Sequence, residues 1–447
     1  MTAAPSPSLA LLTDRYELTM LQAALADGTA DRRCVFEVFT RRLPAGRRYG
    51  VLAGTGRVLE SLERFRFGAF ELDWLADERV VDDATLAFLA DYRFTGSVVG
   101  YAEGEVFFPS SPVMVVEGTF AEAVLLETLV LSILNYDSAV ASAASRMTSA
   151  AVDRPCLEMG SRRAHEEAAV AAARAAVVAG FAGTSNLEAG RRYGLATIGT
   201  AAHAFTLLHD DEAAAFAAQV ASLGTGTTLL VDTYDVRRGV ELALEAAGTG
   251  LGAVRLDSGD LGVLAHEVRA QLDEAGAQGT KITVTSDLDE YAIASLAVAP
   301  VDSYGVGTSV VTGSGAPTCG MVYKLVAREG ADGVLAPVAK AAFGKTSVGG
   351  RKAAARRLGT DGRAVEEVLV TGHDDEVRAW SSPDASLREL HVPLVTDGAV
   401  DPGWTGPDGV RRAAERHRAS RDELPRGARR LSADEAAVPT VALRLGD

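Results

Sequence analysis

An arginine and two aspartates in the middle of the chain have the spacing of an anion-binding site. The segment Val254–Asp260 (VRLDSGD) places Arg255 beside an apolar run and puts Asp257 and Asp260 three residues apart. A guanidinium can pair with a carboxylate or phosphate, and two carboxylates can hold Mg²⁺ or sugar hydroxyls. Asp260 could instead only cap a following helix. We predict that Arg255 and Asp257 are functional, with Asp257 and Asp260 as candidate Mg²⁺ ligands.

A glycine-rich segment further along the chain has the composition of a phosphate-binding loop. Gly305, Gly307, Thr308 and Ser309 lie in YGVGTS, and TGSG follows at 312–315. Glycines let the backbone approach an anion closely, and hydroxyls add donors. The same glycines could serve a plain turn. Because the loop follows the last predicted strand, where barrels often bind phosphate, we predict a phosphate site.

One histidine stands among small residues that leave its ring accessible. His203 ends the segment GTAAH (199–203), which also contains Thr200. A lone histidine can be structural or cap a helix, whereas an accessible imidazole can act as a nucleophile or accept a phosphoryl group. The spacing leaves both interpretations open.

Two arginines follow the first predicted strand of the same region. Arg162 and Arg163 lie in EMGSRR (158–163), where they could grip a carboxylate or phosphate or simply be solvated. Positive charge in the first turn of a helix opposes the helix dipole, which favours a functional role for Arg162.

These residues follow short β-like segments that alternate with Ala-rich helical stretches. Serial βα units indicate a parallel sheet, and seven of them over about 190 residues indicate a closed or nearly closed barrel. Chemistry in such barrels gathers at the carboxyl ends of the strands, where the residues named above fall together with Glu158, Thr184, Asp232 and Asp287. The seven junctions are 156–161, 181–186, 197–203, 229–234, 254–260, 282–287 and 304–309.

The rest of the chain predicts two flanking regions. A helix over 9–26, a strand at Cys34–Thr40 and a cationic turn after it open an N-terminal α/β domain at 9–120. An incomplete parallel α/β barrel follows at 121–325 as the catalytic domain. We predict a C-terminal β-rich cap and helical tail at 326–447, with an amphipathic helix over 411–424.

Composition excludes several classes of protein. The 447 residues carry a formal net charge of −16, which disfavours nucleic acid and anionic membrane surfaces as partners. Three dispersed cysteines indicate neither a disulfide framework nor a zinc site, so we expect a reduced, cytoplasmic protein without a membrane span. The segment HEEAA at 165 lacks the second histidine of a zinc protease motif. The basic segment Lys345–Lys352 could touch phosphates, although an exposed hairpin explains it more simply.

From Leu11 to about Lys352 the sequence resembles nicotinate phosphoribosyltransferases, which are type II phosphoribosyltransferases. The resemblance rests on ordered motifs along that stretch, whereas the tail after about residue 353 matches less specifically. The motifs are LLTDRYELTM (11–20), FEVFTRRLPAGRRYGV (36–51), EGTFAEAVLLET (117–128), EMGSRRAHE (158–166), GFAGTSNLEAGRRYG (180–194), GTAAHAF (199–205), VDTYD (231–235), RLDSGDL (255–261) and GVGTSVVT (305–312).

The resemblance implies an enzyme that joins nicotinate to phosphoribosyl pyrophosphate, forming nicotinate mononucleotide and pyrophosphate in NAD salvage. It implies a homodimer with shared active sites, Mg²⁺, and coupling to ATP through a phosphohistidine at His203. Tyr16 would reach the pyridine ring, Thr200 and Arg255 would hold nicotinate, and Thr308 would bind the phosphoribosyl group.

Four alternatives stay open at this point. Nicotinamide phosphoribosyltransferases carry an Asp where Ser185 stands here, and that Asp would repel a carboxylate, so Ser185 favours the acid. A quinolinate phosphoribosyltransferase would need a denser basic pocket for two carboxylates. A metabolite sensor without turnover, or an unrelated barrel lyase, would release no pyrophosphate.

Overall fold

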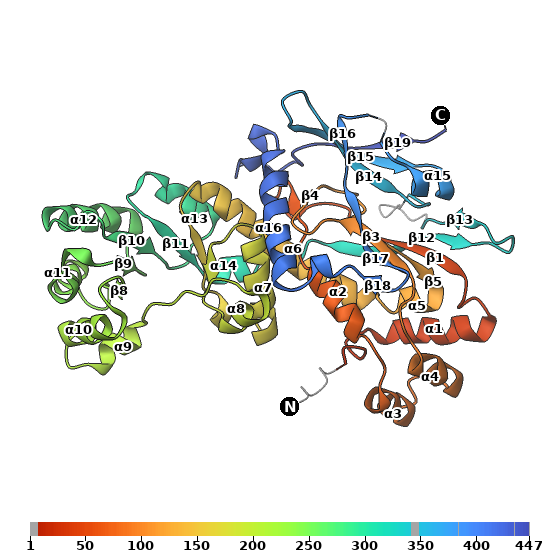
Figure 1. Ribbon diagram of the computed structural model, residues 1–447, viewed down its shortest axis with the longest axis horizontal. Coiled ribbons are helices and arrows are strands. Elements are labelled where there is room, and N and C mark those ends of the chain that lie inside the picture. Colours follow the sequence, from red (N-terminus) through yellow and green to blue (C-terminus); the bar gives the residue numbers. More distant parts are fainter. Residues whose placement is uncertain (1–7, 341–347, 383, 433, 447) are drawn as a thin grey trace. The chain divides into compact units, whose positions relative to one another are not determined.

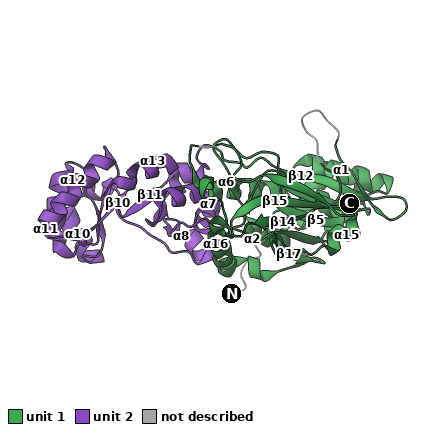
Figure 2. Ribbon diagram, turned by 90° about the horizontal axis from the view of Figure 1, so that it is seen from above, with its two compact units in different colours: residues 1–142, 316–447 green, residues 143–315 purple. Residues whose placement is uncertain are grey.

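The computed structural model describes residues 8–340, 348–382, 384–432 and 434–446 (Figure 1). Residue contacts divide the chain into two compact units (Figure 2). Unit 1 comprises residues 1–142 and 316–447, and unit 2 comprises residues 143–315. No helix among the described residues is both long and apolar enough to cross a membrane.

The main sheet of unit 1 has seven antiparallel strands that come from both ends of the chain. The apolar residues of β1 (Arg33–Thr40) pair with β12 (Met321–Glu329) on one side and β5 (Met114–Thr119) on the other. The order is β13 (Leu335–Pro337), β12, β1, β5, β3 (Ser97–Tyr101), β17 (His391–Thr396) and β18 (Ala399–Val400). The C-terminal region, expected as a separate cap at 326–447, therefore shares a sheet with the N-terminal region.

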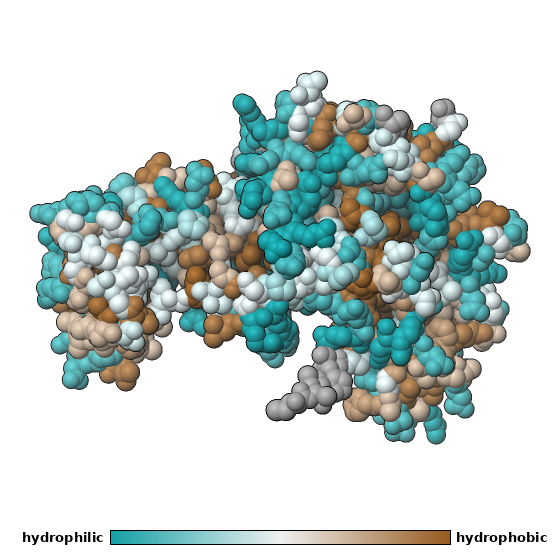
Figure 3. Space-filling model, viewed as in Figure 1, coloured by the Kyte–Doolittle hydropathy of each residue, from teal (hydrophilic) through white to brown (hydrophobic). Residues whose placement is uncertain are grey.

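The C-terminal part of unit 1 adds a second sheet and a long helix. The sheet has the order β16 (Leu387–Glu389), β14 (Ala353–Leu358), β15 (Ala364–Thr371) and β19 (Thr440–Arg444). The predicted amphipathic helix forms as α16 (Gly406–Asp422), and its outer face is covered by hydrophilic residues (Figure 3).

The basic segment predicted as an exposed hairpin is only partly described, because 345–347 lie outside the described residues. Its last two residues, Arg351 and Lys352, are both buried. Lys352 Nζ lies 2.7 Å from the Glu37 carboxylate, and Arg351 pairs with Glu117 and Asp374. Burial is tolerated because each charge has a carboxylate partner, so the exposed-hairpin prediction is wrong for these two residues.

Unit 2 is built around six parallel strands, which confirms the predicted incomplete α/β barrel. The strands match six of the seven predicted junctions, and Asp or Asn side chains cap five of the intervening helices. The order is β7 (Gly183–Thr184), β6 (Cys156–Glu158), β11 (Ser303–Val306), β10 (Lys281–Val284), β9 (Ala253–Leu256) and β8 (Thr228–Leu230).

Helices follow these strands as the alternating pattern predicts (Figure 1). The longer helices cover the sheet, and the shorter helices begin at the ends of several strands. They are α7 (Glu166–Val178), α8 (Leu187–Tyr193), α9 (His203–Leu208), α10 (Glu212–Leu223), α11 (Val236–Ala247), α12 (Leu261–Glu274), α13 (Glu290–Ser295) and α14 (Thr308–Val311).

The remaining predicted junction, 197–203, is a connecting segment rather than a strand. Thr197 makes only a single bridge, to Thr184 of β7. The segment then reaches the opposite side of the sheet, where Thr200 contacts Arg255 and His203 contacts Thr233 after β8. It thus links the two edge strands at their carboxyl ends, where a complete barrel would have further strands.

Candidate active site

Arg255 stands at the centre of the polar cluster at the carboxyl edge of the parallel sheet. It lies on β9, and its side chain is only 14% exposed. Nη1 donates to Thr200 Oγ1 at 2.7 Å and to the Ala201 carbonyl at 3.1 Å, while Nε donates to Thr285 Oγ1 at 3.1 Å. These contacts hold the planar guanidinium at the carboxyl edge of the sheet and bring Thr200 beside it.

Asp257 follows the same strand and completes the cluster. Its carboxylate lies 3.5 Å from Arg255 Nη2 and accepts a hydrogen bond from Thr285 Oγ1. The next residue after Thr285, Ser286, has φ +105°, a conformation that costs a non-glycine residue energy and recurs at functional sites. The structure therefore gathers Arg255, Asp257 and Thr200, and adds Thr285, which the sequence analysis did not single out.

Asp232 is a second carboxylate at this edge, just after β8. Its Oδ2 accepts hydrogen bonds from the Asp257 backbone N–H at 2.8 Å and from Ser258 Oγ at 2.7 Å. The other oxygen, Oδ1, is buried and has no hydrogen-bond partner among the described residues. The sequence pattern predicts its place at a strand end, but not its contacts with Asp257 and Ser258.

Asp260, the other predicted metal ligand, begins α12. Its Oδ1 accepts the Val263 backbone N–H at 3.1 Å, so it forms the helix cap that the sequence also allowed. Within the described ranges no three His, Cys, Asp or Glu side chains form a metal cluster. Asp257 and the free oxygen of Asp232 remain the carboxylate atoms best suited to a hard cation that also has oxygen ligands from a substrate.

His203 is the first residue of α9 and is partly exposed. Its Nδ1 lies 3.1 Å from Thr233 Oγ1, which follows β8. The ring Nε2 makes no hydrogen bond to any residue that the structure describes. If Nδ1 carries the proton and donates it to Thr233, the Nε2 lone pair is free to act as a nucleophile.

The glycine-rich loop lies at the end of β11, between β6 and β10. A Cβ on Gly305 would come within 2.5 Å of Thr285 Cγ2 and 2.8 Å of Met159 Sδ, so only glycine fits there. Gly307 precedes the short helix α14, Thr308 is exposed and Ser309 is partly exposed. The loop therefore offers backbone and hydroxyl donors at the same edge as Arg255.

Arg162 lies in a short turn, η1 (Ser161–Arg163), after β6. β6 and β11 are neighbours in the sheet although they are its first and last strands in sequence, so Arg162 and the glycine-rich loop follow adjacent strands. Arg162 is exposed and, in the described part of the chain, has no ion-pair partner. Its charge is thus available to an anion.

Tyr16, the predicted ring-binding residue, belongs to unit 1 and lies on α1 (Arg15–Asp27). Tyr16 is 45% exposed, and Glu127 is one of the acidic residues near it. Partial burial, together with the nearby negative charge of Glu127, raises the pKa of the Tyr16 phenol. The ring is therefore neutral and available for stacking at physiological pH.

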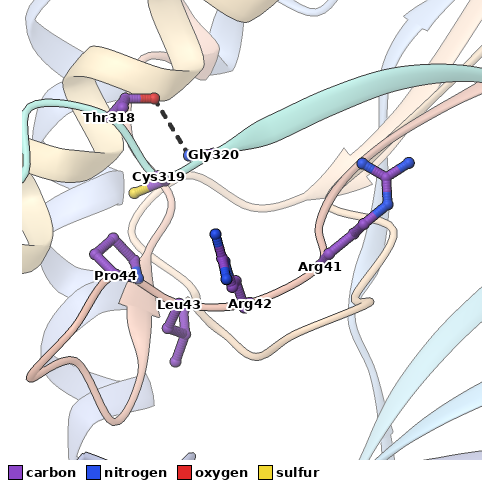
Figure 4. Close-up of a pocket in the computed structure, with 7 residues that line it drawn as sticks. All are labelled: Arg41, Arg42, Leu43, Pro44, Thr318, Cys319 and Gly320. Atoms are coloured by element: carbon purple, nitrogen blue, oxygen red, sulfur yellow. Dashed lines mark hydrogen bonds between the residues drawn. The ribbon is translucent and has the colours of Figure 1, made fainter. Parts of the chain in front are cut away.

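Unit 1 also contains a cationic cavity of about 530 Å³ that was not predicted (Figure 4). One wall is Arg41–Pro44 and the other is Thr318–Gly320. Thr40 Oγ1 ties the walls together, lying 2.7 Å from the Arg42 carbonyl and 2.9 Å from the Cys319 carbonyl. Figure 4 shows the Arg42 guanidinium directed toward the opposite wall. The signal in the sequence was the cationic turn after the first strand.

Known proteins resemble this chain over nearly its whole length. A family model described as the nicotinate phosphoribosyltransferase (NAPRTase) N-terminal domain matches residues 11–135. A nicotinate phosphoribosyltransferase of Mycobacterium tuberculosis is 56% identical over 438 residues, covering 96% of this chain and 94% of that protein. The Bacillus subtilis protein of that name is 39% identical, covering 86% of this chain and 79% of its own.

Solved structures agree with the sequence comparison. The crystal structure of human nicotinic acid phosphoribosyltransferase has a TM-score of 0.80 and 26% identity, covering 96% of this chain and 97% of that one. The nicotinate-nucleotide pyrophosphorylase of Pyrococcus furiosus has a TM-score of 0.75 and 25% identity, covering 95% and 99%. The extent of this similarity shows that the chain belongs to the nicotinate phosphoribosyltransferase family.

Proposed function

We propose that this protein transfers the phosphoribosyl group of phosphoribosyl pyrophosphate to nicotinate, releasing pyrophosphate, as a cytoplasmic step of NAD salvage. The observation that carries the proposal is the Arg255 cluster, in which a positioned guanidinium and the Thr200 hydroxyl face the mouth of the half-barrel. Arg255 Nη2 makes no hydrogen bond to a described residue, so its N–H groups can bind a carboxylate with charge-assisted hydrogen bonds. Nicotinate would be held by its carboxylate, with the pyridine nitrogen free to react.

The reaction requires the protein to bind the substrates and stabilise charge, and it requires no covalent bond to the protein. The pyridine nitrogen attacks C1′ of the ribose while the bond to the pyrophosphate oxygen breaks, so positive charge moves to the ring and negative charge to the leaving group. Gly305, Gly307, Thr308 and Ser309 would bind the phosphoribosyl phosphate, because their loop supplies backbone and hydroxyl donors at the same sheet edge as Arg255. Arg162, after the neighbouring strand, would add a cation near the substrates' negative groups.

Mg²⁺ fits this chemistry as a counterion for the departing pyrophosphate. Asp257 and the unpartnered Oδ1 of Asp232 are the groups that would hold it, with substrate oxygens completing the set. Asp260 is a poorer ligand, because its carboxylate already caps α12. These residues would keep the cation beside the leaving group while Arg255 keeps nicotinate in place.

ATP coupling would act through His203. With Nδ1 on Thr233, the free Nε2 can attack the γ-phosphorus of ATP, forming a phosphohistidine and releasing ADP. Hydrolysis of that bond would accompany the transfer reaction and drive it forward. The imidazole would thus serve energy coupling and not the glycosyl transfer itself.

A homodimer would complete each site. Tyr16 of the partner subunit would stack on the pyridine ring, because an exposed aromatic face suits a planar heterocycle. The cationic cavity at Arg41–Pro44 and Thr318–Gly320 would likewise bring positive charge to the pyrophosphate or ATP phosphates.

The deciding experiment incubates the protein with nicotinate, nicotinamide or quinolinate plus phosphoribosyl pyrophosphate, with and without ATP, and identifies the mononucleotide. We expect nicotinate mononucleotide and pyrophosphate, formed faster with ATP. Formation of another mononucleotide would assign a different substrate. Absence of pyrophosphate release with every acceptor would contradict the proposal and favour a sensor or a lyase.

Substrate choice has its own test at Ser185, which follows β7. Ser185→Asp should lower nicotinate use relative to nicotinamide use, because a carboxylate repels the acid and accepts a hydrogen bond from the amide. Ser295→Asp, on the exposed side of α13, adds the same charge away from the strand ends and should leave the ratio unchanged. An unchanged ratio in a folded Ser185→Asp variant would remove Ser185 from the specificity site.

A further inference from the structure

Thr285 stands between two charged side chains of the candidate active site, Arg255 and Asp257. It directly follows β10, and its backbone N–H donates to the Leu256 carbonyl of β9 at 2.8 Å. Its side chain is buried, and a Cβ on Gly305 would come within 2.5 Å of its Cγ2 methyl group. A β-branched side chain packed in this way keeps a single rotamer. The Thr285 hydroxyl is therefore held at a fixed point.

The direction of each hydrogen bond to this hydroxyl follows from the groups involved. A guanidinium N–H can only donate, so the hydroxyl oxygen accepts from Arg255 Nε at 3.1 Å. An ionised carboxylate can only accept, so the single hydroxyl proton goes to Asp257 Oδ1. The Leu256 carbonyl is a second acceptor, but it lies farther away, at 3.4 Å, and is uncharged. One hydroxyl thus serves an arginine and an aspartate at the same time.

These bonds leave one edge of the Arg255 guanidinium for a ligand. Nη1 donates to Thr200 and to the Ala201 carbonyl, and Nε donates to Thr285. Nη2 lies 3.5 Å from Asp257 Oδ1. A charge-assisted hydrogen bond between such groups is shorter, at about 2.7–2.9 Å. Nη2 and the Asp257 carboxylate are therefore neighbours that have not closed into a direct hydrogen-bonded pair.

The gap between Nη2 and Asp257 depends on Thr285. The Asp257 backbone N–H donates to Asp232 Oδ2 at 2.8 Å, which fixes the main chain at this point. Within the described part of the chain, Thr285 is the only hydrogen-bond donor to the Asp257 carboxylate. Without that donor, the opposite charges of Asp257 and Arg255 would draw the carboxylate onto Nη2. A direct pair would occupy the edge that the nicotinate carboxylate needs.

We propose that Thr285 is a positioning residue that keeps Asp257 from pairing directly with Arg255 and so keeps the Nη2 edge open for a pyridine carboxylate, an inference that rests on the proposed function. Thr285 acts through its two neighbours and touches no substrate. Nicotinate binding should therefore require a hydroxyl at position 285. The hydroxyl should matter only while Asp257 carries the charge that competes for Arg255.

The test measures nicotinate binding by titration calorimetry, together with KM for nicotinate, in Thr285→Val, Thr285→Ser, Asp257→Asn and Thr285→Val/Asp257→Asn. Valine keeps the shape and the methyl group but removes the hydroxyl, so Thr285→Val should weaken nicotinate binding about tenfold, as for the loss of a hydrogen bond to a charged group. Thr285→Ser keeps the hydroxyl and should bind nicotinate like the parent. In the Asp257→Asn background, Thr285→Val should have little further effect, because the competing charge is absent.

Thr283→Val is the matched control. Thr283 lies two residues earlier on β10 and is also buried, and its hydroxyl oxygen lies 2.8 Å from Ser303 Oγ. The same change at this position removes a buried hydroxyl away from Arg255 and Asp257, and it should leave nicotinate binding and KM unchanged. Thermal melting checks that each variant is folded.

The outcomes separate the inference from the proposed function. Parent-like nicotinate binding in folded Thr285→Val, or an equal loss with and without the Asp257 charge, would overturn the positioning role. A similar loss in Thr283→Val would assign the effect to general packing and would overturn it too. A parent protein that neither binds nor turns over nicotinate contradicts the proposed function itself. A parent that uses nicotinate, with Arg255→Ala weakening its binding while Thr285→Val does not, overturns the positioning role alone.

Discussion

Replacing Arg255 by alanine should strongly lower kcat/KM for nicotinate while leaving the fold intact. The side chain is 14% exposed, makes three hydrogen bonds to Thr200, Ala201 and Thr285, and lies 3.5 Å from Asp257. The truncation removes the guanidinium that is proposed to bind the nicotinate carboxylate. It also leaves the Asp257 carboxylate without the cation beside it. For one member of a largely desolvated charge pair the loss is about 2–4 kcal/mol, or roughly 30- to 900-fold in kcat/KM.

The assay is steady-state formation of nicotinate mononucleotide with nicotinate varied at saturating phosphoribosyl pyrophosphate. Arg255→Lys should recover only part of the loss, because a single ammonium cannot keep the contacts to Thr200, Ala201 and Thr285 and bind the nicotinate carboxylate as well. Arg237→Ala is the matched control, since that arginine is 84% exposed and lies 3.9 Å from Glu241 on α11. Parent kinetics in a folded Arg255→Ala protein would refute the assignment of Arg255 to the site.

Three further predictions follow from the same structure. His203→Ala should abolish stimulation by ATP while slow ATP-independent transfer persists; undiminished stimulation in a rate assay would contradict the phosphohistidine. Mixing Tyr16→Ala chains with Arg255→Ala chains should restore one intact site per heterodimer if sites are shared, and confirmed heterodimers without activity would exclude sharing. Burial, reinforced by the positive charge of Arg421, lowers the pKa of His417 from 6.5 to about 3, so its contribution to stability is full above pH 6.5 and is lost as the pH falls toward 3. Between pH 7 and pH 5 the free energy of unfolding of His417→Gln should therefore fall by up to about 2 kcal/mol less than that of the parent, as measured by chemical denaturation at both pH values. An equal fall in the variant and the parent would assign the pH dependence to other groups.

The sequence by itself determined the alternation of strands and helices in unit 2. Parallel strands are buried on both faces, so they appear as short apolar runs such as ITV at 282–284, and polar residues at their ends mark the sheet edge. Arg255, Asp257 and the glycine-rich loop could be placed for that reason. These signals are local, because they depend on periodicity and on the residues that end each run.

Only the tertiary structure decided which segments meet. The pairing of β6 with β11 brings Arg162 and the glycine-rich loop to adjacent strands, and β12 joins β1 across nearly 300 residues of chain. Asp260 caps a helix, whereas Asp232 accepts a hydrogen bond from the Asp257 backbone N–H. An apolar run indicates that a strand is buried, but it does not indicate which strand lies next to it. A charged residue likewise does not indicate whether its partner will be water, a carboxylate or a ligand.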